Sequence, residues 1–240
     1  MARIFITGSA DGLGHLTAET LLGDGHEVIT HVRGEARRSA VGSLVDRGAE
    51  VVVGDLASVE ETRGIADQVN ALGTVDAVIH NAGVYTGAAV IPVNVVAPYL
   101  LTALIDRPAR LVYLSSGLSR GGRADLSRID WSAGSGYGDS KLCVTTLAFA
   151  VARLWPEVLS NAVNPGWVPT KMGGAGAPDD LTLGHRTQEW LATSNDPDAR
   201  TSGAYWFHQA REEPHPAAND EAFQDDLLAS LADYTGTPLR

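Results

Sequence analysis

The feature that most constrains the fold is a regular alternation of short apolar runs with longer segments of helical periodicity. Parallel strands need crossover connections, which are usually helices, and these crossovers are right-handed. The alternation therefore predicts an α/β fold in which helices cover both faces of a doubly wound, mainly parallel sheet. The first six strands are expected at residues 3–7, 27–33, 50–53, 75–80, 110–115 and 158–163.

The segments between these runs have helical spacing and carry helix-end signals. Gly25 and Gly48 follow the first two segments, and Ser58 with Glu61 forms a capping box at the start of the third. Helices are expected at residues 13–24, 35–47, 58–72, 93–105, 135–154, 179–192 and 220–231.

The pattern loosens after residue 165, but no linker separates a second domain. We therefore expect residues 1–240 to form a single domain whose parallel sheet has about seven strands, the last at 203–208. A Gly-rich run at 173–178 lies within a segment, at about 171–200, that we expect to cover a substrate.

Composition excludes several classes of function. The chain has 240 residues, with 18 Lys and Arg against 29 Asp and Glu, which gives a net charge of −11. Nucleic-acid binding needs a clustered basic face, so no nucleic-acid partner is expected. One Cys excludes a disulfide framework, and the seven His residues lack metal-ligand spacing, so no metal site is expected.

One uncharged stretch, residues 88–105, reaches 18 residues, the lower bound for a membrane-spanning helix. Pro92, Asn94 and Pro98 interrupt this stretch, so we expect a buried helix and no membrane span. The first residues hold an apolar run of only three residues, which is unlike a signal peptide. With a single thiol, these features predict a soluble cytoplasmic protein.

A glycine-rich loop follows the first predicted strand. Residues 7–14 read Thr-Gly-Ser-Ala-Asp-Gly-Leu-Gly. Glycines let the backbone turn sharply and approach a pyrophosphate, whose charge then lies at the N-terminus of the next helix. The predicted cofactor contacts in this loop are Gly8, Ser9, Asp11, Gly12, Leu13 and Gly14.

The end of the second strand indicates which dinucleotide binds. It holds Arg33 and no carboxylate that could accept hydrogen bonds from a ribose 2′-hydroxyl. The planar guanidinium suits a 2′-phosphate, and Arg37 and Arg38 are near in sequence. We therefore expect NADP(H) in preference to NAD(H), although the charge of Asp11 opposes a 2′-phosphate.

Tyr137 and Lys141 lie four residues apart on the predicted helix 135–154 and share one face. An ammonium about 4 Å from a phenolate contributes about 4 kcal/mol at an effective dielectric near 20. We therefore expect Lys141 to bring the pKa of Tyr137 close to neutral, so that the phenol can exchange a proton with an alcohol or carbonyl. Ser115 and Ser116 end the fifth strand at the same edge of the sheet.

With these motifs in this order, the chain resembles the short-chain dehydrogenase/reductase family from residue 3 to about residue 170. The resemblance implies a Rossmann-type fold and the catalytic residues Ser116, Tyr137 and Lys141, with Asn94 holding a water of the proton relay. It adds Asp55 and Leu56 after the third strand and Asn81, Ala82 and Gly83 after the fourth. It also adds a loop over the nicotinamide, with Pro165, Gly166, Val168 and Thr170, and it assigns Tyr137 and Lys141 to the cofactor site.

The stretch 111–171 further resembles the retinol-dehydrogenase-like branch. That likeness implies NADP(H) and carbonyl or alcohol substrates, which are often lipophilic. Family members often pair through the long catalytic helix, which implies a homodimer or homotetramer. Trp167 and Trp190 flank the Gly-rich run and are candidates for lining a substrate pocket.

The expected reaction is reversible hydride transfer between NADP(H) and a carbonyl/alcohol pair. In reduction, Ser116 and Tyr137 hydrogen-bond the carbonyl oxygen, and Tyr137 delivers the proton. An alternative is a non-catalytic NADP(H)-sensing protein on the same fold, which would not need the complete Ser, Tyr and Lys set. A nucleotide-sugar epimerase shares the Tyr-x-x-x-Lys pair, but the chain after Pro165 looks too short for that group's substrate domain.

Overall fold

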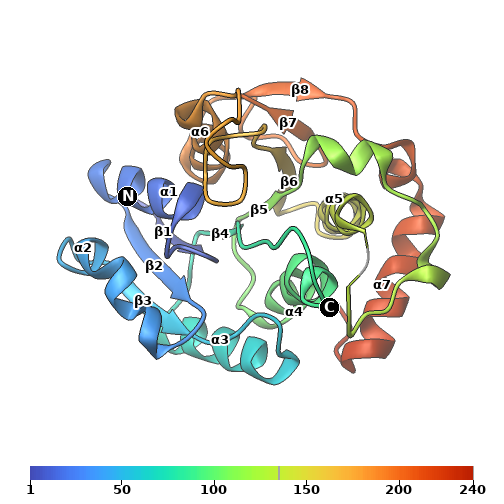
Figure 1. Cartoon of the computed structure of the whole chain (residues 1–240), viewed down its shortest axis with the longest axis horizontal. Helices are drawn as coiled ribbons and strands as arrows, with labels where there is room; N and C mark the ends of the chain where they lie inside the picture. The colour runs from blue at the N-terminus through green and yellow to red at the C-terminus, as the bar shows by residue number, and fades with distance from the viewer. Residues whose placement is uncertain (135, 240) are drawn as a thin grey trace.

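The strands form one sheet in the order β3-β2-β1-β4-β5-β6-β7-β8 in the computed structural model, which describes residues 1–134 and 136–239 (Figure 1). Strands from β3 to β7 pair in parallel, and β8 pairs antiparallel with β7. The predicted doubly wound α/β fold is thus confirmed. The strands span Arg3–Ile6 (β1), Glu27–Val32 (β2), Glu50–Val53 (β3), Ala77–His80 (β4), Arg110–Leu114 (β5), Leu159–Asn164 (β6), Tyr205–Phe207 (β7) and Ala210–Glu212 (β8).

Helices cover both faces of the sheet, and the side chains of each strand alternate between two cores. Ile4 and Ile6 of β1 point into the core beneath α1 and α6, whereas Phe5 points into the opposite core beneath α3, α4 and α5. The helices span Gly12–Gly23 (α1), Gly42–Val45 (α2), Val59–Leu72 (α3), Ala97–Leu104 (α4), Tyr137–Leu154 (α5), Leu181–Thr193 (α6) and Glu221–Thr235 (α7). The predicted start of α5 at Ser135 lies outside the described residues.

The predicted helix at 35–47 is wrong in form. The structure has a 3-10 helix, η1 (Glu35–Val41), followed by the single turn of α2. Val41 and Leu44 are the buried positions of these two elements, so little apolar surface holds a longer helix in place. Gly42 between them further lowers helix propensity.

The prediction of about seven strands missed β8. A two-residue turn joins it to β7, and both turn residues, His208 and Gln209, have positive φ angles of 49° and 62°. Such turns normally carry Asn and Gly, so the sequence gives no hairpin signal here. The alternation of β8 is also weak, because Ala210 and Arg211 are exposed.

The long helix α5 is covered on its outer side by the end of the same chain. All residues from Asp139 to Val151 are buried. Leu227 and Leu231 of α7 share a core with α5, and Arg153 Nε donates to Gln224 Oε1 at 2.8 Å. Figure 1 shows α7 alongside α5. Within one chain, α5 therefore has no exposed face over these residues, and the pairing of two copies stays a prediction.

Among the residues that the structure describes, no helix has both the length and the apolar character needed to cross a membrane. The uncharged stretch instead forms a π-helical turn, η2 (Pro92–Val96), that continues into α4. Both elements are almost entirely buried inside the domain, as expected.

His80, at the end of β4, is buried without a charged partner. Its ring stacks on Tyr113 at 4.6 Å, and its Nε2 lies 3.2 Å from Thr102 Oγ1. Burial lowers the pKa of His80 from 6.5 to about 3. The folded chain therefore keeps this imidazole neutral in mildly acidic solution.

We expect His80 to make the fold acid-sensitive. Between pH 6.5 and about 3 the unfolded chain binds a proton that folded His80 does not, so the free energy of unfolding falls as pH falls. Replacing His80→Asn should remove up to about 1.4 kcal/mol per pH unit of that slope. Urea unfolding at pH 4 to 7 measures it, with His215→Asn as control. Equal slopes in wild type and His80→Asn would contradict the assignment.

Candidate active site

A cleft of about 560 Å³ opens at the carboxyl ends of the central strands, where the strand order reverses. Open α/β sheets bind their ligands at this edge, and the volume is typical of a ligand pocket. Most of the predicted site residues meet here. Those that line the cleft are Gly8, Asp11, Gly12, Leu13, Arg33, Asp55, Leu56, Asn81, Ala82, Gly83, Tyr137, Lys141, Pro165 and Thr170.

The loop between β1 and α1 forms one wall of the cleft and depends on its glycines. Gly8 and Gly12 have φ angles of +70° and +58°, which other residues rarely adopt. A Cβ at Gly8 would also lie 3.0 Å from Ala82 Cα. The loop leads into the N-terminus of α1, whose unpaired N–H groups favour an anion such as a phosphate.

Three other predicted residues support the cleft from behind its wall. Ser9 is buried, and its hydroxyl donates to the Ile6 carbonyl at 2.7 Å. Gly14 packs so closely on the Asn81 amide that a Cβ would overlap it. Val168 is buried against α6. These three residues do not line the cleft but shape residues that do, and their cofactor contacts stay a prediction.

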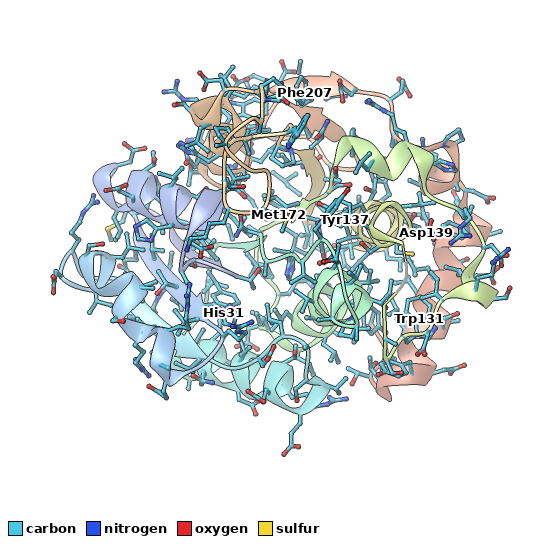
Figure 2. All side chains as sticks on the ribbon, in the orientation of Figure 1. His31, Trp131, Tyr137, Asp139, Met172 and Phe207 are labelled. Atoms are coloured by element: carbon cyan, nitrogen blue, oxygen red, sulfur yellow. The ribbon has the colours of Figure 1, made fainter. Side chains whose placement is uncertain are left out.

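His31 holds the glycine loop in place through hydrogen bonds. The sequence analysis did not identify this residue. Its Nδ1 accepts a hydrogen bond from Gly8 N at 3.0 Å, and its Nε2 contacts the Gly54 carbonyl at 2.8 Å. Its backbone N donates to Ser9 Oγ at 3.2 Å. Burial lowers the pKa of His31 and so favours the neutral ring that this pattern needs. Figure 2 places His31 at the β2 side of the site. A polar residue inside the apolar strand run was the available signal.

Asp11 is neutralised by two cations at the edge of the cleft. Its carboxylate lies 3.2 Å from Arg37 Nη2 and 2.8 Å from Lys171 Nζ. The hydrogen bond from Lys171 is the main reason that the pKa of Asp11 is lowered. Asp11 therefore opposes a 2′-phosphate less than its formal charge suggests. Arg33 also lines this end of the cleft, whereas Arg38 pairs with Glu35 at 2.5 Å.

Ser116 and Tyr137 meet at the other end of the cleft. Ser116 caps the short helix η3 (Gly117–Gly121), and its hydroxyl accepts a hydrogen bond from Leu118 N at 3.3 Å. The Ser116 side chain also lies near enough to the Tyr137 phenol to favour a lower pKa for it. A hydroxyl and a phenol that face the same position can both hydrogen-bond the oxygen of a carbonyl or alcohol bound there.

The predicted lowering of the Tyr137 pKa is wrong for the structure as it stands. Burial raises the pKa of Tyr137 to about 12, against a smaller opposite effect of Ser116. Lys141 does share its helix face, but Nζ lies 5.5 Å from the Tyr137 ring centroid and donates to the Leu114 carbonyl at 2.7 Å. Desolvation of the phenolate outweighs the field of an ammonium that is turned to another partner.

Lys141 and Asn94 flank the same glycine. A Cβ on Gly83 would lie 3.4 Å from both Lys141 Nζ and Asn94 Oδ1, so the missing side chain leaves space between them. Asn94 lies in η2, and its amide bonds both backbone groups of Val84 and the Ser140 hydroxyl, at 2.8 to 3.0 Å. π-Helical turns are rare and are frequent at functional sites. Burial lowers the pKa of Lys141 to about 8.

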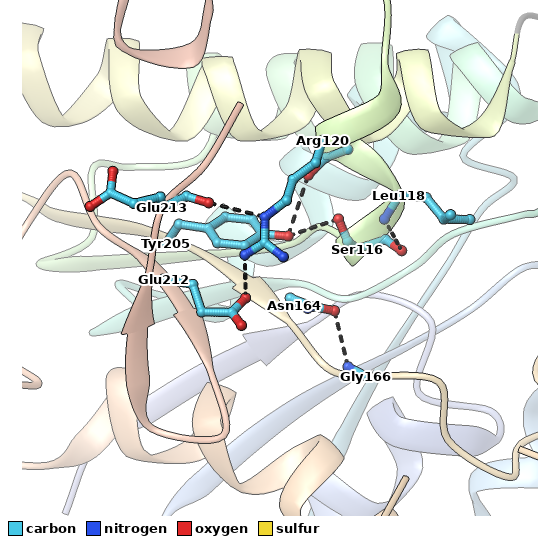
Figure 3. A network of polar contacts seen from close by, with 9 residues as sticks. Ser116, Leu118, Arg120, Asn164, Gly166, Tyr205, Glu212 and Glu213 are labelled. Atoms are coloured by element: carbon cyan, nitrogen blue, oxygen red, sulfur yellow. Dashed lines mark hydrogen bonds and ion pairs between the residues drawn. The ribbon is translucent and has the colours of Figure 1, made fainter. Parts of the chain in front are cut away.

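Tyr205 supports Ser116 from β7, and sequence reasoning missed this residue as well. Its hydroxyl donates to the Ser116 carbonyl at 2.7 Å and lies 3.3 Å from Ser119 Oγ (Figure 3). The Arg120 guanidinium lies 5.6 Å above the Tyr205 ring and pairs with Glu212 of β8 at 2.6 Å. The unpredicted hairpin thus helps to fix the reacting end of the cleft.

The loop after β6 carries the remaining predicted residues. Gly166 has a φ of +85°, and its N–H donates to Asn164 Oδ1 at 3.1 Å (Figure 3). Trp167 is exposed, but Trp190 packs edge-on against Trp206 at 5.1 Å. Trp190 is therefore half-buried against the core and does not line the cleft, so its prediction as a pocket residue is wrong.

We expect Lys141 to lower stability, because an ammonium is buried there. Between pH 8 and 10.5 the folded chain binds fewer protons at Lys141 than the unfolded chain, so stability rises with pH in that range. Lys141→Met should raise the free energy of unfolding at pH 7 by about 1 to 3 kcal/mol and flatten that rise. Denaturant unfolding at pH 7 to 10 tests this.

The matched control is Lys171→Met, because Lys171 is 78% exposed and pairs only at the surface. Its effect should stay within about 1 kcal/mol. A Lys141→Met protein less stable than wild type at pH 7 would contradict the argument.

The chain is similar in sequence to proteins of one family. The family model described as short chain dehydrogenase matches residues 2–180. An uncharacterised oxidoreductase of Emericella nidulans is 38% identical over 251 residues, covering 98% of each chain. A short-chain dehydrogenase of Penicillium rubens is also 38% identical, over 100% of this chain and 99% of its own. A blue fluorescent protein from a metagenomic library, solved with NADPH, shares the fold with a TM-score of 0.73 and 20% identity, over 86% of this chain and 95% of its own.

Proposed function

Because the chain belongs to the short-chain dehydrogenase family, we propose that it transfers hydride between NADP(H) and a carbonyl/alcohol pair. One observation carries the proposal. Tyr137 and Lys141 line the same ligand-sized cleft, and the Ser116 side chain lies near enough to the Tyr137 phenol to favour a lower pKa for it. A binding protein without catalysis would not need these three groups together.

The residues of the cleft fit a dinucleotide. The glycine loop and the start of α1 offer backbone N–H groups suited to a pyrophosphate, and Arg33 and Arg37 line the same end of the cleft, which supports a 2′-phosphate there. Asp55, Leu56 and Asn81 to Gly83 continue the wall, and Pro165 and Thr170 close the other side. When bound, the nicotinamide supplies or accepts the hydride.

Ser116 and Tyr137 act on the oxygen of the substrate. In reduction, both hydroxyls hydrogen-bond the carbonyl oxygen and polarise it. With a pKa near 12, Tyr137 is protonated at neutral pH and is therefore ready to donate its proton as negative charge develops on that oxygen. Tyr205 holds Ser116 through its carbonyl and so fixes the direction of its hydroxyl.

Lys141 and Asn94 help to return a proton to Tyr137 after it has donated its own. Below its pKa of about 8, Lys141 carries a charge that stabilises the phenolate left on Tyr137, and its ammonium is also suited to the ribose hydroxyls of the cofactor. We assign the space beside Gly83, between Lys141 and Asn94, to the water that links Lys141 to solvent. Residues 171–200 cover the substrate in this proposal.

Tyr137→Phe tests the catalytic assignment. Loss of the proton donor should lower kcat by at least about a hundredfold while the Kd for NADPH stays nearly unchanged. NADPH oxidation at 340 nm over a panel of ketones and aldehydes measures turnover, and fluorescence titration measures binding. The exposed Tyr234→Phe serves as control.

Turnover that survives Tyr137→Phe would overturn the assignment. Tight NADPH binding without turnover of any substrate would instead favour a non-catalytic sensor of NADP(H).

Arg33 should decide the choice of cofactor. Removing a guanidinium that bonds a 2′-phosphate costs roughly tenfold or more, so Arg33→Ala should lower kcat/KM for NADPH by about that factor and change NADH little. Arg38→Ala is the matched control, since Arg38 pairs with Glu35 and does not line the cleft. An equal loss with both cofactors, or a wild type that prefers NADH, would refute the NADP(H) preference.

A further inference from the structure

Four large apolar side chains remain exposed on the segments that follow β4, β5 and β6. Tyr85 contacts Tyr137, Leu118 contacts Ser116, and Met172 lines the cleft on the same loop as Trp167. They are Tyr85, Leu118, Trp167 and Met172, which are 52%, 52%, 60% and 50% exposed. A concentration of exposed apolar side chains on a protein surface usually marks a binding site.

Tyr85 is the aromatic ring nearest to the catalytic phenol. Its ring centroid lies 4.7 Å from that of Tyr137, with an angle of 52° between the planes. The preceding residue, Val84, is clamped through both backbone groups by Asn94, at 2.8 and 3.0 Å. Tyr85 is therefore held beside the reacting phenol while half of its surface stays free for a ligand.

Trp167 is also fixed while it stays exposed. Its indole N–H donates to the Gly173 carbonyl at 2.9 Å, and its backbone N–H donates to Asp179 Oδ2 at 2.6 Å. Met172 follows on the same loop and lines the cleft with Tyr137 (Figure 2). A rigid indole and a flexible, polarisable thioether are both suited to contact with an aromatic ring.

Leu118 lies on the side of Ser116. With Tyr85, Trp167 and Met172 it makes up what we call the apolar rim. Its backbone N–H donates to Ser116 Oγ, so its side chain starts next to the hydroxyl that would bind a carbonyl. The three segments that follow β4, β5 and β6 thus each carry at least one exposed apolar side chain near the cleft.

Charged groups gather at the opposite end of the cleft. Arg33, Arg37 and Asp11 lie beside the glycine loop, where Lys171 is held by Asp11 at 2.8 Å. At the rim, the carboxylate of Asp179 accepts the Trp167 N–H. A charged substrate group would therefore lose its hydration at the rim without gaining a dedicated partner.

We propose that the substrate is a neutral aryl ketone or aldehyde whose ring stacks on Tyr85, with its outer part against Trp167, Met172 and Leu118. This inference rests on the proposed function. The reaction is a two-electron reduction in which hydride from the reduced nicotinamide bonds to the carbonyl carbon and the Tyr137 proton bonds to the oxygen.

The experiment compares 2-acetylnaphthalene with its fully saturated counterpart, decahydronaphthyl methyl ketone. The two share a carbon skeleton and differ in aromaticity. The Kd of each is measured by calorimetry with full-length protein in saturating NADP⁺, and kcat/KM is measured with NADPH. The variants are Tyr85→Leu and Tyr85→Phe, with Tyr234→Leu as an exposed tyrosine on α7, away from the site.

The aryl ketone should bind about fivefold more tightly than the saturated one, as an aromatic pair implies. Tyr85→Leu should remove this difference, whereas Tyr85→Phe and Tyr234→Leu should keep it. Equal Kd values in wild type, or a preference that survives in Tyr85→Leu, would overturn the inference, even if both ketones are reduced. Selective binding of the aryl ketone without turnover of either would support the aryl site and instead count against the proposed reaction.

Discussion

The contact between the glycine loop and the end of β4 is the constraint on which the rest of the site depends. The Asn81 amide donates to the carbonyls of Thr7 and Gly8, at 2.9 and 3.2 Å, and Ala82 N donates to Thr7 Oγ1 at 3.0 Å. His31 ties the same loop to the other neighbouring strand. These bonds fix the start of α1 relative to two strands, and so fix where an anion and the reacting groups can lie.

Much of this arrangement could be predicted because it is encoded locally. The alternation of short apolar runs with segments of helical periodicity predicted the order of strands and helices. Glycines with positive φ marked the loop after β1, and a four-residue interval placed Tyr137 and Lys141 on one helix face. The carboxyl edge of a parallel sheet then brings such segments together.

The parts that could not be predicted depend on contacts between distant residues. The β7–β8 turn uses His208 and Gln209 in place of the usual Asn and Gly, and Tyr205 reaches Ser116 across 89 positions of sequence. The pKa of Tyr137 follows from burial and from where Lys141 points, neither of which a sequence interval reveals. Local spacing determines which groups can meet, whereas packing determines their pKa values and so their protonation states.

The cover that α7 provides for α5 has a consequence for how the site is maintained. Tyr137 and Lys141 keep their one-turn separation only while α5 stays regular, and that helix is held between η2 and α7 of its own chain. The geometry of the two groups is therefore an internal property of each molecule. It rests on the C-terminal helix of the same polypeptide, which already shields α5 from water.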